Sequence, residues 1–315
     1  MAGTAATLAL LIANPVILQA ETTRIASEVP PVGEDIVDGI EDAHARLTVP
    51  VALHGKGPYQ FLIDTGSQRT AVATRVAESL ALASGPRVRI VSIAGISGVA
   101  SARIEEMRFG EQTLTGLDVP LLDGRHIGAD GIVGTDSLQD RRVLLDFDKN
   151  LIAIGDPQDL GGSSGFDIVV RARRKSGQLI IARAVIDGVK TSVVVDTGAS
   201  HSIGNLALQR ALRGRDRGSA TIASVTGQTL AAQMGVATKL TIGKLQVTNV
   251  AIAFADTPAF RELDLHAKPA LFLGMRELRA FRRVAIDFPT REVRFDVDEV
   301  RPIVNYVDHP SRIDQ

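Results

Sequence analysis

The chain is built around the stretch Phe61-Leu62-Ile63-Asp64-Thr65-Gly66-Ser67, because a close copy returns 132 residues later as Val193-Val194-Val195-Asp196-Thr197-Gly198-Ala199. In both copies three apolar residues lead into the tripeptide Asp-Thr-Gly, and a small residue follows. A short apolar run bounded by a turn signal is typical of a buried strand, and glycine permits a tight backbone turn. Each copy therefore predicts a strand that delivers a carboxyl group into a loop.

Two such loops suit a reaction that needs two carboxyl groups. Carboxyls held about 3 Å apart cannot both ionise, so they share one proton. One carboxylate then takes a proton from a water molecule while the other, protonated, polarises a peptide carbonyl. If Asp64 and Asp196 meet in this way, the hydroxyls of Thr65 and Thr197 are placed to tie the two loops together. The pair predicts hydrolysis without a covalent intermediate.

The rest of the second half repeats the first in the same order. Residues 47–53 and 59–63 read as a hairpin that delivers Asp64, and residues 179–186 and 191–195 as one that delivers Asp196. Short strands and frequent turns favour a small closed barrel in each half. We therefore expect an all-β protein of two homologous closed β-barrel lobes with short helices, an N-terminal lobe at 46–157 and a C-terminal lobe at 166–299.

The remaining segments are expected to lie outside the lobes. Residues 4–20 are uncharged and mostly apolar, too short for a good spanning helix, so we expect a signal peptide or N-terminal anchor at 1–20 and a periplasmic or secreted protein. The acidic segment 21–45 is read as a linker or leader, with a propeptide or a strap across the lobes as alternatives. The Gly-rich segment 158–165 is a linker, and residues 300–315 are a tail.

Composition excludes several kinds of function. The 315 residues carry a net charge of −1 and no cysteine, which excludes thiol catalysis and thiolate metal sites and gives no electrostatic attraction to nucleic acid. The six histidines show no metal-ligand spacing, and the basic clusters contain no interleaved aromatic residues. We expect no metal, no cofactor and no nucleic-acid partner.

The combined pattern resembles the retropepsin and pepsin-type aspartic proteases. It comprises an apolar strand, Asp-Thr-Gly-Ser or Asp-Thr-Gly-Ala, a Gly-bearing hairpin about thirty residues on, and an apolar pair before Gly134 or Gly274. The resemblance covers most of the chain and is closest to two-lobed bacterial proteins with retropepsin-like halves. It implies a catalytic dyad of Asp64 and Asp196. The supporting residues that it implies are Thr65, Gly66, Ser67, Gly134, Thr197, Gly198, Ala199 and Gly274.

The chain departs from the pepsin-like pattern in its candidate flaps. Pepsin-like enzymes carry a tyrosine on a single flap, whereas the segments 93–100 and 223–229 contain no tyrosine and are both small and Gly-bearing. We therefore expect two flap-like hairpins over the cleft, closer to the retroviral plan. The flap residues expected to bind substrate are Gly95, Ile96, Ser97, Gly98, Val225, Thr226 and Gly227.

A second departure concerns the residues that follow the two tripeptides. The hydroxyl of Ser67 can donate a hydrogen bond to Asp64, whereas Ala199 offers none to Asp196. A hydrogen bond to the ionised form favours that form. We therefore expect Asp64 to be the ionised partner and Asp196 the protonated one, with a weakly acidic optimum.

The resulting expectation is an aspartic endopeptidase that is active as a monomer. Its protein or peptide substrate should lie extended in the cleft and pair with the flap strands. One alternative is a non-catalytic peptide-binding or scaffold protein on the same fold. The other is an enzyme whose halves pair between two chains, as retroviral members do.

Overall fold

The computed structural model describes residues 36–38, 40–41, 46–162, 165–213, 216–297 and 313–314, all within one compact unit. The expected signal peptide or anchor at 1–20 lies outside the described residues. So do most of the expected leader at 21–45, positions 163 and 164 of the expected linker, and all but two residues of the tail. Among the residues that are described, no helix is long and apolar enough to cross a membrane.

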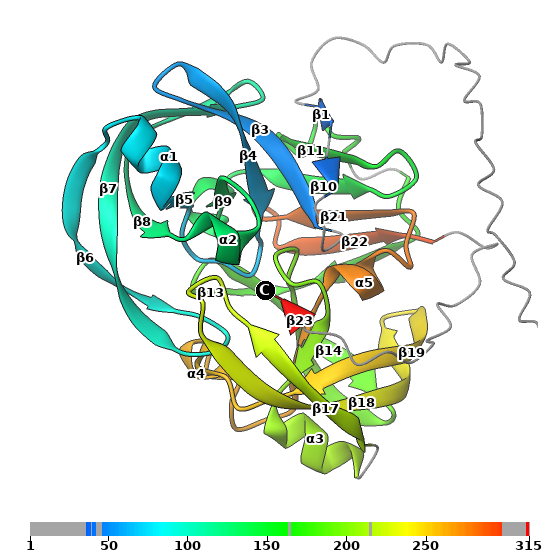
Figure 1. Ribbon diagram of the computed structural model, residues 1–315. Coiled ribbons are helices and arrows are strands. Elements are labelled where there is room, and N and C mark those ends of the chain that lie inside the picture. Colours follow the sequence, from blue (N-terminus) through cyan, green and yellow to red (C-terminus); the bar gives the residue numbers. More distant parts are fainter. Residues whose placement is uncertain are drawn as a thin grey trace, which may run out of the picture. The chain divides into compact units, whose positions relative to one another are not determined.

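Six strands of the N-terminal half close into a ring (Figure 1). The alternation of residues 47–53 buries Val49, Val51 and Leu53 completely, because successive side chains of a strand point to opposite faces. In order around the ring the strands are β3 (Leu47–Leu53), β4 (Lys56–Ile63), β9 (Gly131–Val133), β5 (Ala71–Ala73), β8 (Gln112–Leu122) and β7 (Ile96–Phe109), which pairs back with β3. Further elements are β2 (Ile40–Glu41), β6 (Ala83–Val91), α1 (Thr74–Ser79), α2 (Gly124–Ile127) and the 3-10 turn η1 (Thr135–Ser137).

The C-terminal half forms a second closed ring with the same topology. Its strands are β14 (Gln178–Ile186), β15 (Val189–Val195), β20 (Ala270–Leu273), β16 (Ser202–Gly204), β19 (Leu245–Phe254) and β18 (Thr229–Ile242), which pairs back with β14. Further elements are β13 (Arg173–Lys175), β17 (Asp216–Ala223), β23 (Ile313–Asp314), α3 (Leu206–Leu212), α4 (Pro258–Glu262) and α5 (Met275–Leu278). In both rings the strand before the Asp-Thr-Gly loop pairs in parallel with the strand before Gly134 or Gly274. The expected pair of homologous barrels is confirmed.

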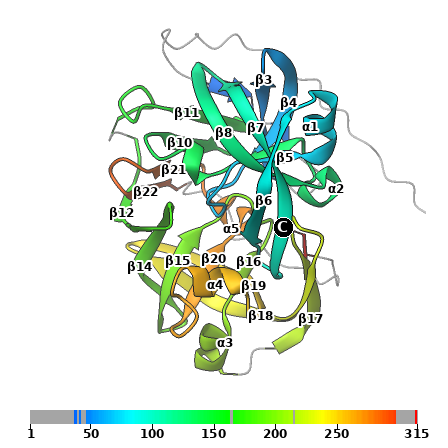
Figure 2. The same ribbon diagram turned by 90° about the vertical axis from the view of Figure 1, so that its left-hand side faces the viewer.

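A six-stranded sheet joins the two barrels, and Figure 2 shows it beside them. Its strands in order are β1 (Ile36–Asp38), β11 (Leu151–Gly155), β10 (Arg142–Asp146), β21 (Arg283–Asp287), β22 (Glu292–Asp296) and β12 (Ile168–Arg171). Strands β10 and β11 form one hairpin and β21 and β22 another, and β10 also pairs with β21 across the lobes. There Arg142 and Asp287 form an ion pair of 2.6 Å whose side chains are 1% and 0% exposed.

Candidate active site

Both Asp-Thr-Gly loops begin at the end of a strand that is held by its parallel neighbour. The backbone N–H of Asp64 donates to the carbonyl of Val133 (3.1 Å), and that of Asp196 donates to the carbonyl of Leu273 (3.0 Å). These matching bonds fix the point at which each chain leaves its barrel. The two carboxyl-bearing loops consequently meet between the barrels.

The two threonines interlock the loops as expected. Thr65 donates its hydroxyl to the carbonyl of Val195 (2.8 Å), and Thr197 donates its hydroxyl to the carbonyl of Ile63 (2.5 Å). Each hydroxyl also accepts the backbone N–H of the opposite threonine, at 3.0 Å for Thr65 N–H and 3.3 Å for Thr197 N–H. Both side chains are buried, so these bonds are shielded from competing water.

The tripeptide glycines bring the opposite carboxyl groups close. A Cβ atom on Gly66 would overlap the carboxyl group of Asp196, and one on Gly198 would overlap the carboxyl group of Asp64. Neither glycine has a positive φ angle, so space rather than backbone conformation requires glycine here. Each carboxyl therefore packs against the loop that carries the other.

The electrostatic environment differs between the two carboxyl groups. Burial raises the pKa of Asp64 above its ordinary value, while backbone N–H groups of Ser67 and Gly66 and the charge of Arg46 oppose the rise. Burial and then the nearby Asp64 charge raise the pKa of Asp196 well above its ordinary value. Of the two carboxyl groups, Asp196 therefore has the higher pKa and holds a proton more readily than Asp64.

The source of this asymmetry is not the one expected from the sequence. The hydroxyl of Ser67 donates to the carbonyl of Arg69 (2.9 Å) and not to Asp64. Instead the backbone N–H groups of Gly66 and Ser67 each donate to Asp64 Oδ1 at 2.8 Å. Backbone N–H groups of Gly198 and Ala199 act on Asp196 in the same way, so the amides favour both ionised carboxyl groups, whereas the charge of Arg46 acts on Asp64.

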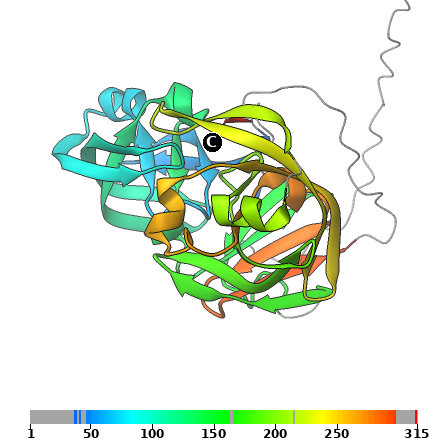
Figure 3. The same cartoon turned by 90° about the horizontal axis from the view of Figure 1, so that it is seen from below.

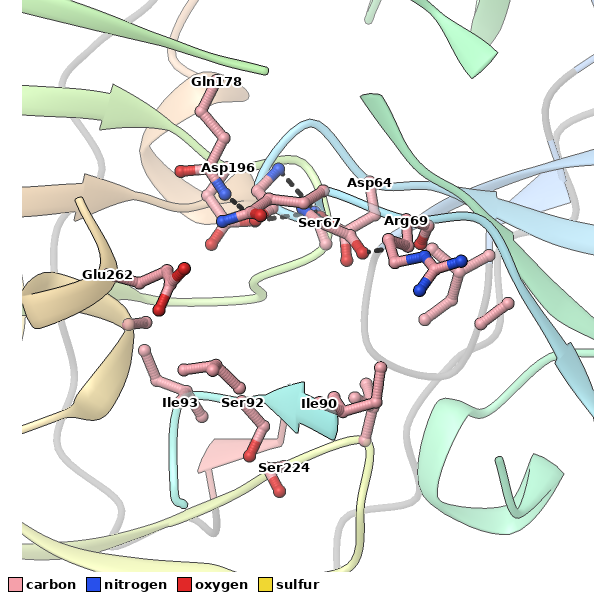
Figure 4. Close-up of a pocket in the computed structure, with 18 of the residues that line it drawn as sticks. Asp64, Ser67, Arg69, Ile90, Ser92, Ile93, Gln178, Asp196, Ser224 and Glu262 are labelled. Carbon is pink, nitrogen blue, oxygen red and sulfur yellow. Dashed lines mark hydrogen bonds between the residues drawn. The ribbon is translucent and has the colours of Figure 1, made fainter. Parts of the chain in front are cut away.

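The dyad residues line a single cavity together with the tips of two hairpins (Figure 4). Ile132 and Phe272, from matching strands of the two barrels, form apolar parts of its wall. Among the described residues, no group of three or more His, Asp or Glu side chains is placed to hold a metal ion. The arrangement can transfer protons to and from a molecule held in the cavity.

Comparison with known protein families settles the relationship. The family model described as "Aspartyl protease" matches residues 49–137 and again residues 182–276, together more than half of the chain. The chain belongs to the aspartyl protease family. Each match contains one Asp-Thr-Gly loop, in agreement with the two barrels. No curated protein matches the chain.

In this aspartyl protease family member, Gly134 and Gly274 lie beneath the loops as the resemblance implied. A Cβ on Gly134 would lie 2.6 Å from the carbonyl oxygen of Arg69, and one on Gly274 would lie 2.7 Å from that of His201. The turn after each glycine also holds its loop, because Thr135 N–H donates to the carbonyl of Ser67 (2.9 Å). In the second barrel Met275 N–H donates to the carbonyl of Ala199 (2.8 Å).

Two hairpins extend over the cavity, and Figure 3 shows the β17–β18 hairpin (yellow) reaching toward the strands of the first barrel. The first hairpin, β6–β7, turns where Ser92 N–H donates to the carbonyl of Gly95 (2.8 Å). The tips touch, with the hydroxyls of Ser92 and Thr226 3.3 Å apart and Ser97 Oγ donating to Gln228 Oε1 (3.1 Å). Two hairpins therefore meet above the dyad.

The hairpin residues that line the cavity differ from those expected. Because the first turn closes at Gly95, the residues that reach the cavity are 89–91 at the end of β6 and 92–93 in the turn itself. Of the expected flap residues, only Val225 lines the cavity. Strand β7 carries Ile96, Ser97 and Gly98, and the second turn contains Thr226 and Gly227. A role of the flap residues in substrate binding stays a prediction.

Sequence reasoning missed a pair of residues that bridge the barrels. Arg46 donates to the carbonyl of Gly198 (3.5 Å) and to that of Ile127 (2.6 Å), and Gln178 donates to the carbonyl of Gly66. Positions 46 and 178 are 132 residues apart, which is the spacing of the two Asp-Thr-Gly tripeptides. The repeat offset was the signal that could have found them.

Proposed function

We propose that the chain is an aspartic endopeptidase that hydrolyses peptide bonds with a water molecule activated by Asp64 and Asp196. The observation that carries the proposal is that carboxyl groups from two barrels meet, each against the glycine of the other loop, in one cavity. Membership of the aspartyl protease family supports it. The uneven electrostatic environment supplies the base and the acid that the reaction needs.

The proposed reaction moves one proton in each direction. Ionised Asp64 accepts a proton from water as the water oxygen bonds to the peptide carbonyl carbon, and protonated Asp196 donates its proton to the carbonyl oxygen. When the tetrahedral intermediate collapses, the carbon–nitrogen bond breaks and the leaving amine takes the proton held by Asp64. The hydroxyl that Asp196 protonated returns its proton to Asp196 as the carboxylic acid product forms.

The substrate and the active unit are parts of the same proposal. An extended peptide would lie between the dyad and the hairpin tips and pair its backbone with a flap strand. One chain supplies both carboxyl groups to the cavity, so we propose that a single chain suffices for activity. Export to the periplasm or cell exterior remains a proposal that rests on residues 4–20.

Proteolysis of an unfolded protein mixture by a chain that lacks residues 1–20, from pH 3 to 8, tests the function. Asp64→Asn and Asp196→Asn should each abolish cleavage. Asp256→Asn is the matched control, because Asp256 is exposed, pairs with Arg261 and does not line the cavity. Cleavage that survives in either dyad variant would disprove the shared-proton reaction.

A further inference from the structure

Charged side chains of opposite sign lie on opposite sides of the cavity. Figure 4 shows Glu262 on the Asp196 side and Arg69 on the Asp64 side. Glu262 ends helix α4 of the second barrel, and Arg69 follows the Asp-Thr-Gly loop of the first. A second guanidinium, that of Arg89 on the β6 flap strand, also lines the cavity.

Within the described part of the chain, neither Glu262 nor Arg89 has an ion-pair or hydrogen-bond partner for its side chain. Their neighbours are satisfied: Arg261 pairs with Asp256 (2.6 Å), and Arg87 donates to the carbonyl of Gly98. The charges that face the cavity are therefore available for binding, whereas those that face away are already engaged.

Arg69 retains binding capacity although it makes one hydrogen bond. One terminal nitrogen donates to the carbonyl of Asp118 (2.8 Å), which orients the guanidinium beside the loop of Asp64. A guanidinium has five N–H donors and binds a carboxylate in a fork geometry. The remaining donors, among described residues, meet no acceptor.

We propose that the cavity selects peptides with an acidic side chain on the Asp64 side of the scissile bond and a basic side chain on the Asp196 side. Arg69 would bind the acidic side chain, and Glu262 would bind the basic one. This inference rests on the proposed function, in that it identifies the class of peptide that the same cavity takes.

The charges also fix the direction in which a peptide lies. A peptide with its acidic and basic residues exchanged would place like charges together at both sides, which is unfavourable. The cavity wall also contains the apolar residues Ile132 and Phe272, from matching strands of the two barrels. The preferred substrate therefore combines apolar residues with two opposite charges, one on each side of the scissile bond.

Binding of uncleavable peptides tests the inference without relying on catalysis. The probes are fluorescent octapeptides in which a neutral hydroxyethylene group replaces the central bond between two leucines. One set of probes carries Glu on one side of the centre and Lys on the other, each two or three residues away, and a second set carries them in the reverse order. A third set has Ala at both positions. Fluorescence anisotropy gives the dissociation constants for the wild-type chain, Glu262→Gln, Arg69→Gln and the exposed-carboxylate control Asp256→Asn.

One order of Glu and Lys should bind more tightly than the Ala peptide, by about fivefold for each exposed charge pair. Glu262→Gln should remove only the preference for Lys over Ala, and Arg69→Gln should remove only the preference for Glu over Ala. Asp256→Asn should leave both preferences unchanged. The inference would be overturned if the affinity did not depend on the order of Glu and Lys, or if no peptide bound. It would also be overturned if Glu262→Gln weakened binding of the charged and the Ala peptides equally. Charge-dependent binding without proteolysis would overturn the proposed reaction and leave the recognition intact.

Discussion

Replacement of Thr197 by valine removes the hydroxyl that ties the two active-site loops and changes the side-chain shape very little. That hydroxyl donates to the carbonyl of Ile63 (2.5 Å) and accepts the N–H of Thr65 (3.0 Å). Thr197 is 2% exposed, so water cannot replace the lost partners. Thr197→Val thus takes the Thr197 hydroxyl away from two buried groups, the carbonyl of Ile63 and the backbone N–H of Thr65.

The expected cost follows from those two groups. A buried polar group that loses its hydrogen-bond partner costs about 1–3 kcal/mol, so the variant should lose about 3 kcal/mol of unfolding free energy. For a domain of this size that corresponds to a fall in Tm of about 6–12 °C. Thr197→Ser provides the matched control, because it deletes a methyl group but keeps the hydroxyl.

Differential scanning calorimetry of the wild type and both variants measures the effect. Thr197→Ser should lie much closer to the wild type than Thr197→Val. Catalytic rate should fall with Thr197→Val as well, because the hydroxyl fixes the separation of the loops that carry the dyad. Equal Tm values for the serine and valine variants would show that the loss comes from packing and that the interlocking bonds do not hold the loops together.

Three further predictions follow from other buried charges. Arg46→Gln should move the acid limb of the kcat/KM profile to higher pH, because the guanidinium favours ionised Asp64. Arg46→Lys keeps the positive charge and should move the limb less. An acid limb that stays in place in both variants would contradict the reasoning. Arg142→Met should cost about 3–5 kcal/mol in urea unfolding because it leaves Asp287 buried and unpaired, and a wild-type midpoint would contradict this. Burial raises the pKa of Glu277 from 4.5 to about 7, so the folded state binds this proton more tightly than the unfolded state. The resulting stabilisation is complete below pH 4.5, and about 3 kcal/mol of it is lost as the pH rises toward 7. Glu277→Gln should therefore flatten the fall of Tm over that range, and an unchanged slope would count against a proton on Glu277.

The duplicated barrels could be predicted because their signals are local. An apolar strand followed by Asp-Thr-Gly needs only neighbouring residues to be recognised, and the order of the repeats gave the topology twice. The sheet that joins the barrels could not be predicted, because residues 142–146 have the same pattern whether they pair within a lobe or with residues 283–287. Periodicity determines which face of a strand is buried but does not identify its neighbour.

The same limit applied to the site itself. The tripeptides identified the two carboxyl groups, but the proton acceptor and donor are distinguished by contacts that the sequence does not display. Ser67 was expected to act on Asp64 through its hydroxyl, and the backbone amides perform that role instead. Likewise, the position of the first flap turn depends on one backbone bond, between Ser92 and Gly95, which shifts the cavity-lining residues toward the start of the hairpin.

A duplicated chain can treat its two carboxyl groups differently, whereas a symmetric homodimer presents two identical environments to them. Here the symmetry is broken at matching positions: Arg46 donates to the carbonyl of Gly198, and Gln178 donates to the carbonyl of Gly66. Both side chains hold the opposite loop, but only one carries a charge, and that charge favours ionised Asp64. The two barrels can therefore keep the same hydrogen-bond geometry, while the charge of Arg46, which Gln178 does not carry, adds to the effects that favour ionised Asp64.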